Sequence, residues 1–474
     1  MPRRVFTLAP MPPEQAAYAL ARYSRSPDSI ADSIEWVRRH DSHRFLESFY
    51  FQYGHASIAD LGHLTVCFEG ISDLAATEIE DEPLWDGQAR SSRYQDFSRA
   101  GFITPTELDP ADAAAYESAA ARLLGEYKRL HAAMVERLRE RLTKPDEMKP
   151  EAYERNIAAR AFDVARYLLF FGIPTGVGQV TSIRTLEKQI RRLKASPYAE
   201  LRDVARELAE ACAAPPSCGG GEAAQPLCPT LAKYVEADEY LDAARRGLAR
   251  WAAANLPPAA AAAVPTSPVD ALKPSDGAAA TAATLLYPVS TRPFRELYEL
   301  ARGWSAARRA EVIDAAIAPR RARDELLRDF RGGEYVFDIV MDIGAWRDLH
   351  RHRRCFQARQ GFSLNLGYET PQAIADAGLA AQYEAAIGDA LAAARALPAP
   401  ARDYLLPFAV RSRFLFKMDL AEAEYIIKLR TGVKGHFSYR KIAWEMKQAL
   451  EKLEPELARI VTATPPWMED PLQR

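Results

Sequence analysis

Apolar residues recur along this chain with two different periods, and these periods predict its elements. Between residues 113 and 142 they return every three or four positions, the spacing of an amphipathic helix. Residues 63–72 and 335–344 instead form apolar-rich runs of the kind found in β-strands. Long helical patterns fill the gaps between these runs, so the sequence predicts a helix-rich α/β or α+β protein.

The apolar pattern occurs in both halves of the chain. Tyr404 lies 237 residues after Tyr167, and this offset aligns YLLFF with YLLPF. With this alignment the helical period continues without a gap through Ile190 and Ile427. Each half then shows a short β-like or turn segment followed by two helices. These correspondences predict an internal duplication.

A change of composition separates the two halves. The chain has 474 residues, enough for two or three domains. Residues 250–285 are dominated by alanine and proline and contain almost no large apolar residue to anchor a core. This composition favours an interdomain linker or a loosely packed strap. We therefore predict a first domain at 1–249, a linker at 250–285 and a second domain at 286–474.

Overall composition narrows the class of protein. Hydrophobic residues make up 48% and charged residues 27% of the chain, as in soluble globular proteins. A net charge of −2 gives no global field that attracts nucleic acid or an anionic membrane. No apolar stretch reaches the roughly 18 residues of a spanning helix. The first residues lack an apolar core of signal-peptide length, so we expect a cytoplasmic protein.

The cysteines favour neither a disulfide framework nor a metal site. There are five, an odd number and too few to staple a chain of this size. Cys212, Cys218 and Cys228 surround a loop rich in proline and glycine, but their spacing is unlike a zinc knuckle and no histidine lies near. Cys355 has no histidine–acid partner in the sequence, so we interpret it as a packing residue and not a nucleophile.

A cluster of basic residues provides the strongest candidate chemistry. Arg351, His352 and Arg353 are consecutive, and Arg354 and Arg359 follow. Guanidinium groups bind phosphate bidentately, and a neighbouring imidazole can donate to a cofactor ring or carry a proton. The cluster therefore indicates an anion site, and the alternative interpretation is a solvated basic face.

The order of these features resembles the flavin-dependent thymidylate synthases, and it does so twice. That family carries Arg-His-Arg, seven residues and then Ser, with Gly-His-x-Ser upstream and Asn-x-Arg-x-Leu and Leu-Arg downstream. In the first half, the Arg-His-Arg position falls on Asp81-Glu82-Pro83, which reverses its charge. The matching residues of this half are His55 in the Gly-His-x-Ser segment, Ser91 and Arg93 at the serine end, Arg166 at a nucleotide-contacting arginine and Arg184 in the Asn-x-Arg-x-Leu segment.

The second half retains the other parts of the pattern. Arg-His-Arg is intact at 351–353 and Leu-Arg at Leu429-Arg430, whereas the motif serine falls on Gly361. The offset of 237 carries Arg430 back onto Leu193. The family motifs that one half has lost tend to remain in the other half. This distribution predicts one working composite site for each fused pair of domains. Random decay of the two copies is the alternative.

The resemblance implies a reaction and a set of ligands. A one-carbon unit passes from methylenetetrahydrofolate to C5 of dUMP or a related pyrimidine nucleotide. Reduced FAD supplies the hydride, NADPH reduces the flavin, and no metal takes part. His352 and Arg430 would be the catalytic residues. The flavin would be held by Arg351, His352, Arg353, His55 and Arg184, and the nucleotide by Arg166, Ser91, Arg93 and Arg430.

Several of these residues also have a structural interpretation. Arg166 could form an ion pair or lie at a helix end, and Arg184 could belong to a solvated helix face. Arg430 could serve as a cation at the C-terminus of its helix. His55 is equally consistent with a half-buried structural histidine, and Ser91 with a turn or cap.

Two other classes of protein remain as alternatives. One is a catalytically degenerate protein that keeps the fold and binds a nucleotide or flavin. The other is a nucleic-acid-binding protein that uses residues 347–359, which balanced charge and the lack of aromatic-interleaved basic repeats disfavour. The resemblance also implies two similar domains facing each other as a pseudo-dimer, which a second chain completes to a pseudo-tetramer.

Overall fold

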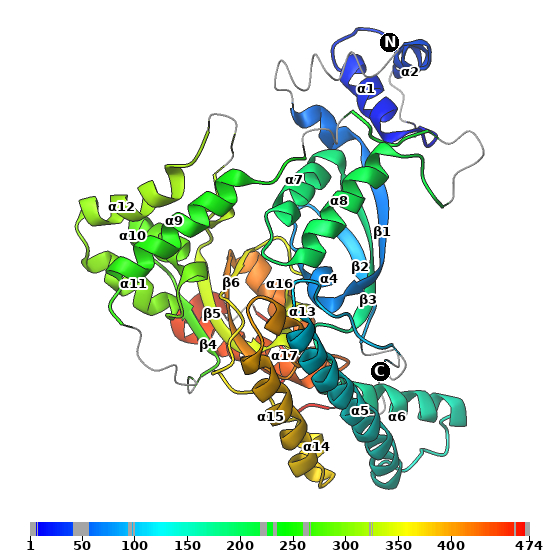
Figure 1. The fold of residues 1–474 in the computed structure, drawn as a ribbon, viewed down its shortest axis with the longest axis vertical. Coiled ribbons are helices and arrows are strands. Elements are labelled where there is room, and N and C mark those ends of the chain that lie inside the picture. Colours follow the sequence, from blue (N-terminus) through cyan, green and yellow to red (C-terminus); the bar gives the residue numbers. More distant parts are fainter. Residues whose placement is uncertain are drawn as a thin grey trace. The chain divides into compact units, whose positions relative to one another are not determined.

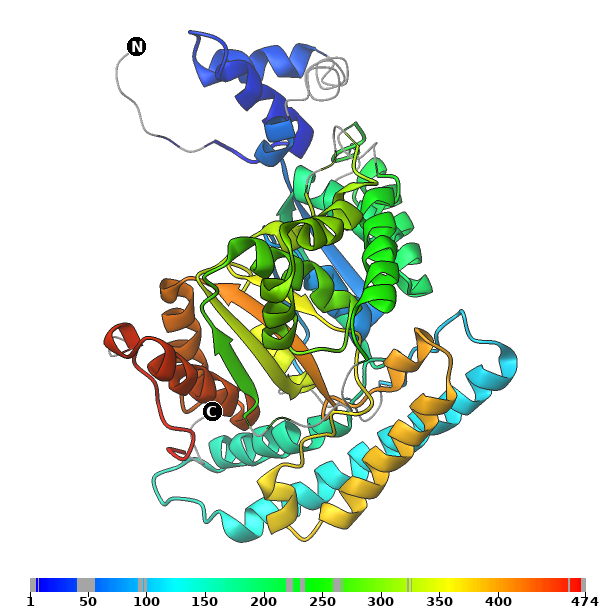
Figure 2. The same cartoon turned by 90° about the vertical axis from the view of Figure 1, so that its left-hand side faces the viewer.

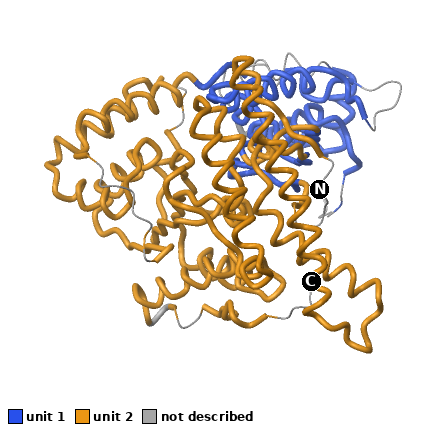
Figure 3. The backbone as a smooth tube through the Cα atoms, turned by 60° about the horizontal axis from the view of Figure 1, so that its bottom comes forward, with its two compact units in different colours: residues 1–69, 78–89, 176–238 blue, residues 70–77, 90–175, 239–474 orange. Residues whose placement is uncertain are grey.

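The computed structural model describes residues 6, 8–40, 56–92, 97, 100–218, 225–230, 235–258, 265, 267–321, 324, 326–458 and 461–469. The chain forms two compact units, which Figure 3 distinguishes by colour. Unit 1 contains Met1–Glu69, Glu78–Ala89 and Gly176–Asp238, and unit 2 contains Gly70–Thr77, Arg90–Thr175 and Glu239–Arg474.

Unit 1 holds most of a three-stranded sheet with the order β1-β3-β2. Its strands are β1 (His63–Ser72), β2 (Asp86–Ala89) and β3 (Pro174–Ser182). Over its first six residues β1 largely alternates exposed and more buried side chains, the pattern of a strand with one covered face. The helical elements associated with this part of the chain are α1 (Pro13–Tyr23), α2 (Ile30–Arg39), η2 (Ala56–Leu61), α4 (Asp73–Glu80), α7 (Ile183–Lys194) and α8 (Ala199–Ala213).

Unit 2 contains an antiparallel four-stranded sheet with the order β4-β5-β7-β6. Its strands are β4 (Val269–Leu272), β5 (Tyr335–Asp342), β6 (Phe356–Arg359) and β7 (Arg411–Met418). Every residue of β5 is buried, because its sequence YVFDIVMD offers apolar side chains to both faces of the sheet and both faces are covered. Figure 2 shows α9 (Glu239–Asn255), α10 (Gly277–Leu286), α11 (Phe294–Gly303) and α12 (Ala306–Ile317) gathered over one of these faces.

Long helices complete unit 2. The predicted helix at 113–142 is confirmed as α5 (Pro110–Arg141), which begins at the N-cap Asp109. It packs against α6 (Pro150–Ala165) and α15 (Ala380–Ala396), as Figure 1 shows. The other elements of the unit are η3 (Arg166–Leu168), η4 (Tyr287–Val289), η5 (Arg328–Phe330), α13 (Ile343–Leu349), α14 (Gln372–Asp376), η6 (Ala401–Leu405), α16 (Leu420–Arg430), α17 (Phe437–Leu453) and α18 (Pro455–Ala458).

The predicted linker at 250–285 is wrong for most of its described residues, which form helix or strand. This segment contains the end of α9, all of β4 and most of α10. Ala279, Ala282 and Ala283 of α10 have no exposed surface and belong to a core cluster with Leu415 of β7. Alanine packs here because its small side chain lets a helix approach a sheet closely, without the large apolar residues that mark a core in the sequence.

The internal duplication is confirmed element by element. We call the elements β1 to α8 the first copy and the elements β5 to α17 the second copy. In the sequence, the offset of 237 residues aligns β3 with β7 and α7 with α16. The helix α7 begins at the N-cap Ser182, and α16 begins at the N-cap Asp419. The sheet registers also agree, since β2 pairs with β3 from Asp86↔Val180 and β6 pairs with β7 from Phe356↔Lys417.

The two copies exchange backbone hydrogen bonds inside unit 2, at the YLLFF and YLLPF segments. Phe171 N donates to Leu406 O at 3.3 Å, and its counterpart Phe408 N donates to Leu169 O at 2.8 Å. Phe170 and Pro407, equivalent residues, form an antiparallel bridge. The two segments therefore contact each other with pseudo-two-fold symmetry. Because this contact joins the two copies within unit 2, the compact units do not follow the predicted domain boundaries.

None of the helices in the described ranges combines the length and the apolar character that a membrane crossing requires.

Candidate functional site

The basic triplet 351–353 is held in a turn between a helix and a strand of the second copy. Asp342, the last residue of β5, accepts a hydrogen bond from Ala345 N at 2.7 Å and so caps α13. The helix ends at Leu349, whose carbonyl accepts from His352 N at 3.1 Å. From β6, the Gln357 side chain donates to His352 O at 2.6 Å. The backbone of the triplet is therefore fixed on both sides.

His352 is the centre of a chain of three polar side chains, in which His352 and Glu422 are buried and Arg430 is half-buried. Arg430 Nε, at the end of α16, donates to His352 Nε2 at 2.8 Å. On the other side of the ring, His352 Nδ1 lies 3.7 Å from Glu422 Oε1 in the first turn of the same helix. Since Nε2 accepts a hydrogen bond from a guanidinium, the proton of the neutral ring is on Nδ1 and faces the carboxylate.

The electrostatic surroundings keep this ring neutral. His352 is only 6% exposed, and burial is the largest cause that lowers its pKa below the ordinary histidine value. The Glu422 carboxylate raises the pKa, whereas the positive charge of Arg430 lowers it. A neutral His352 can act as a hydrogen-bond acceptor that orients Arg430.

Among the residues that the structure describes, Arg351 is the cation of the triplet without a hydrogen-bond or ion-pair partner. Its side chain is half-buried, and its Nε is shielded from solvent without a hydrogen bond. Across the described part of the chain no carboxylate forms an ion pair with it. An unpaired guanidinium in such a position is costly and is relieved by an anionic ligand.

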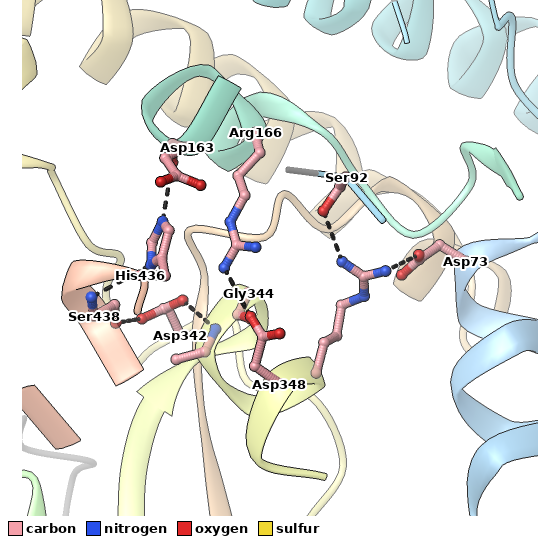
Figure 4. A network of polar contacts seen from close by, with 11 residues as sticks. Asp73, Ser92, Asp163, Arg166, Asp342, Gly344, Asp348, His436 and Ser438 are labelled. Atoms are coloured by element: carbon pink, nitrogen blue, oxygen red, sulfur yellow. Dashed lines mark hydrogen bonds and ion pairs between the residues drawn. The ribbon is translucent and has the colours of Figure 1, made fainter. Parts of the chain in front are cut away.

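Arg166 joins the first copy to the second (Figure 4). It stands where α6 passes into η3, it is 2% exposed, and its Nη2 donates to Gly344 O at 3.2 Å. The same nitrogen lies 3.3 Å from an oxygen of Asp348. The predicted nucleotide-binding arginine therefore carries an ion pair within the protein, which agrees with the structural interpretation of this residue.

A second cross-copy ion pair lies in the same network. Arg347 of α13 donates to Asp73 at 2.5 Å and to the Ser92 hydroxyl at 3.1 Å. Its guanidinium also lies over the Phe408 ring, 4.5 Å from the centroid. Ser91, a predicted nucleotide contact, is half-buried and precedes Ser92, whose hydroxyl accepts the hydrogen bond from Arg347.

The α17 helix is tied to the same region through a buried carboxyl. The Ser438 hydroxyl donates to Asp342, and His436 Nε2 lies 3.0 Å from Asp163 O (Figure 4). Burial raises the pKa of Asp342 to about 6, while the Ser438 and Ala345 hydrogen bonds partly oppose this. The carboxyl thus connects the start of α13 to the start of α17.

The first copy replaces the histidine contact with an ion pair. Glu82 occupies the position of His352, and Arg192 precedes Leu193, the position of Arg430. Arg192 Nε donates to Glu82 Oε1 at 2.8 Å, and its Nη2 donates to Glu78 O at 2.7 Å. In the first copy the Arg192–Glu82 ion pair therefore occupies this location, and its two charges neutralise each other.

The remaining predicted site residues are distributed as follows. Arg184 belongs to unit 1 and pairs with Asp60 at 3.0 Å, with both side chains about a third exposed. Arg353 is half-buried beside His352. His55 and Arg93 lie outside the described residues.

Sequence reasoning missed three residues of the site. Glu422 stands three positions after the cap Asp419, a capping-box spacing that was available as a signal. Arg347 and Asp348 precede the triplet by one helical turn, and that spacing places them on neighbouring positions of the same helix end. Their partners Asp73 and Arg166 are distant in sequence, so no local pattern indicates the pairing.

Cysteine and metal chemistry find no support in the described residues. Burial raises the pKa of Cys355 to about 12, and its thiol lies 3.1 Å from His352 O, so the sulfur stays protonated and serves packing. Within those residues no group of three or more histidine, cysteine or acidic side chains is arranged to hold a metal ion.

A duplicated sheet-and-helix unit with an Arg-His-Arg turn defines the class of this protein. The chain belongs to the family described as thymidylate synthase complementing protein, the flavin-dependent thymidylate synthase family. The family's sequence model matches twice, at residues 8–215 and 269–456. The predicted family and the two-copy architecture are thus confirmed.

Several known proteins are similar to this chain. A UPF0159 protein of Chlamydia muridarum is 25% identical over 415 residues, which cover 85% of this chain and 77% of that protein. A UPF0159 protein of Chlamydia pneumoniae is 26% identical over 426 residues, covering 87% and 78%. The UPF0159 protein Ta1429 of Thermoplasma acidophilum is 33% identical over 163 residues, covering 32% and 33%.

Among solved structures, the chain is similar to the flavin-dependent thymidylate synthase ThyX from Helicobacter pylori complexed with FAD and dUMP. The identity is 16%, the match covers 42% of this chain and 89% of that chain, and the TM-score is 0.25.

Proposed function

We propose that this protein is an FAD-dependent thymidylate synthase-like enzyme. In this proposal it transfers a one-carbon unit from methylenetetrahydrofolate to C5 of dUMP or a related pyrimidine nucleotide, and NADPH reduces the flavin. Family membership supports the class of reaction. The observation that carries the proposal is Arg351, whose buried Nε has no hydrogen-bond partner among the described residues and which lies close in sequence to His352 of the Arg430–His352–Glu422 chain.

The residues present fit a flavin and a phosphorylated nucleotide. FAD, when bound and reduced by NADPH, would supply the hydride that the one-carbon unit needs to become a methyl group. Arg351 binds an anionic oxygen of the cofactor, because its Nε has no competing partner. Within the described part of the chain Arg430 forms a hydrogen bond through Nε alone, to His352, so its terminal nitrogens are available for the nucleotide.

We assign His352 a positioning role in this site. Its Nε2 accepts from Arg430 and its Nδ1 faces Glu422, so both ring nitrogens are engaged within the protein. His352 therefore orients the Arg430 guanidinium, and Glu422 fixes the tautomer that makes this orientation possible. This role differs from the ring-facing role that the family resemblance implies for the residue.

The spectrum of the purified protein tests the proposal. We expect bound or added FAD to give visible flavin absorbance that NADPH bleaches. We expect Arg351→Ala to weaken flavin binding, and we expect His352→Ala to weaken dUMP binding through the loss of its contact to Arg430. Glu82→Gln is the matched control, since it alters the equivalent position of the first copy and keeps a hydrogen-bonding partner for Arg192. Protein that neither carries flavin nor takes up added FAD would reject the proposal.

A degenerate nucleotide- or flavin-binding protein is the second candidate. Two observations favour it: Arg166 and Arg347 are already paired with Asp348 and Asp73. Such a protein would bind FAD or dUMP without forming the methylated nucleotide, so product analysis under reducing conditions separates it from the enzyme.

The reciprocal hydrogen bonds between the two copies support a pseudo-dimer within one chain. We propose that two chains associate into a pseudo-tetramer. Sedimentation at micromolar concentration should give the mass of a dimer, and a monomer mass would refute this part of the proposal.

A further inference from the structure

The end of α16, which carries Arg430, is fastened by a segment that follows the family match. The second match ends at residue 456, whereas residues 461–469 form a segment that we call the C-terminal strap. Its Val461 is buried, and its Trp467 packs edge-on against Trp444 of α17 at 5.3 Å between ring centroids. The strap is therefore attached to α17 by apolar contacts.

One buried arginine connects the strap to α16. Arg440, in the first turn of α17, is 2% exposed. Its Nε donates to Thr431 O at 3.1 Å, and its Nη2 donates to Pro465 O at 3.1 Å and to Met468 O at 2.7 Å. One guanidinium thus donates to carbonyl oxygens on two separate segments. The planar guanidinium can bridge these oxygens, whereas the single ammonium group of a lysine cannot.

Thr431 is held by the strap directly as well. It has no exposed surface, and its hydroxyl accepts a hydrogen bond from Thr464 N at 3.0 Å while donating to Ile427 O at 2.8 Å. Thr431 immediately follows Arg430, so these bonds fix the backbone from which the Arg430 side chain extends. The Arg430 guanidinium also lies over the Tyr439 ring, 5.4 Å from its centroid, next to Arg440.

We propose that the C-terminal strap and Arg440 form a clamp that positions Arg430 for the nucleotide. The clamp holds the main chain at the end of α16, and the Arg430–His352–Glu422 chain holds the side chain. Together they restrict the guanidinium before a ligand arrives, which reduces the entropy lost on binding. The inference rests on the proposed function, in which Arg430 binds the nucleotide, and Arg440 is a positioning residue within it.

Two variants of the full chain test the clamp. Arg440→Lys keeps the charge but cannot bridge Thr431 O to the strap carbonyls, and Thr431→Val keeps the shape but removes the acceptor for Thr464 N. Arg292→Lys is the matched control, because Arg292 is also buried and donates to the Pro258 carbonyl, at 2.7 Å, without a contact to Arg430 or the strap. We measure amide hydrogen exchange in residues 428–436 and the dUMP dissociation constant.

We expect exchange in this segment to accelerate about tenfold in both clamp variants and to stay unchanged in the control. We expect dUMP to bind about tenfold more weakly in the same two variants. Unchanged exchange in Arg440→Lys would overturn the clamp, and so would faster exchange with unaltered dUMP affinity. Failure of the wild-type protein to bind dUMP would instead refute the proposed function, and the exchange comparison would then decide alone whether the strap holds the turn.

Discussion

At the scale of single residues, the arginines of this protein separate into two kinds. Arg166 is fully buried and bonded to Asp348 and Gly344 O, so its charge is compensated within the fold. Arg351 is half-buried, and no compensating group lies beside it in the described ranges. Proteins retain such costly unpaired charges mainly where function requires them. The two arginines should therefore respond in opposite ways to replacement.

Replacing Arg351 should separate binding from stability. We expect Arg351→Ala to weaken FAD binding at least about tenfold, with the free energy of unfolding changed by less than about 0.5 kcal/mol. Arg354→Ala, at the exposed neighbouring position, is the control and should alter neither quantity. Calorimetric titration and urea unfolding measure the two effects. A loss of stability without a loss of flavin affinity would show that Arg351 is structural.

Replacing Arg166 should have the converse effect on stability. Arg166→Met removes the buried cation that contacts Asp348 and the Gly344 carbonyl. We expect a loss of about 3 kcal/mol in the free energy of unfolding. Urea unfolding measures it, and a change below about 1 kcal/mol would contradict the assignment of Arg166 as a structural cation.

The histidine of the triplet gives a third residue-scale prediction. Glu422 raises the pKa of His352, so Glu422→Gln should lower that pKa further and leave the ring neutral at still more acidic pH. Protonation of His352 would place a proton on Nε2 and break its bond from Arg430, so nucleotide binding should weaken as pH falls through this pKa. Nuclear magnetic resonance of the imidazole measures the shift. An upward shift in Glu422→Gln would contradict the arrangement.

At the scale of elements, the start of α13 is where strand, helix and neighbouring helix meet. Asp342 ends β5, caps α13 and accepts the Ser438 hydroxyl of α17. A single buried carboxyl therefore joins three elements that frame the basic triplet. Because burial raises its pKa to about 6, the folded protein binds this proton more tightly than the unfolded chain does.

This carboxyl should make stability depend on pH. Between about pH 4 and 6 the unfolded chain releases the proton first, so Asp342 reduces stability as pH rises, by up to about 3 kcal/mol. We expect Asp342→Asn to gain stability relative to the wild type over this window. Ser438→Ala should extend the window to higher pH, since the hydroxyl lowers the pKa. Urea unfolding at several pH values measures both, and parallel curves would contradict the prediction.

The elements also show how far the sequence predicts this structure. β5, α5 and the paired helices were predicted because their apolar periods are local and strong. The sequence predicts a linker where α10 lies, because buried alanines carry no periodic signal. The basic triplet was predicted from its residue types, whereas Glu422 and the cross-copy ion pairs depend on folding that brings distant residues together.

At the scale of the whole molecule, the duplication has produced two unequal copies. The second copy keeps the His352–Arg430 contact, and the first copy has Glu82 and Arg192 bonded in its place. Reciprocal backbone bonds between the copies, such as Phe171 N to Leu406 O, make each copy part of the other's structure. One copy therefore serves as a scaffold for the site of the other.

Separation of the copies tests this dependence. A fragment of residues 286–474 lacks Leu169 and Phe171, so Phe408 N and Leu406 O lose their partners. It also lacks all of the core helix α10 except its last residue, Leu286. We expect the fragment alone to show no cooperative thermal transition in near-ultraviolet circular dichroism, and co-expression with residues 1–285 to restore one. Cooperative unfolding of the isolated fragment would contradict the dependence.

The number of flavins that one chain binds tests the central claim most directly. If the second copy supplies the cations of a working site and the first copy has closed its own with the Glu82–Arg192 ion pair, spectroscopic titration should saturate at one FAD per chain. Two FAD molecules per chain would mean that both copies function, and no binding would mean that neither does. Either result would contradict the account.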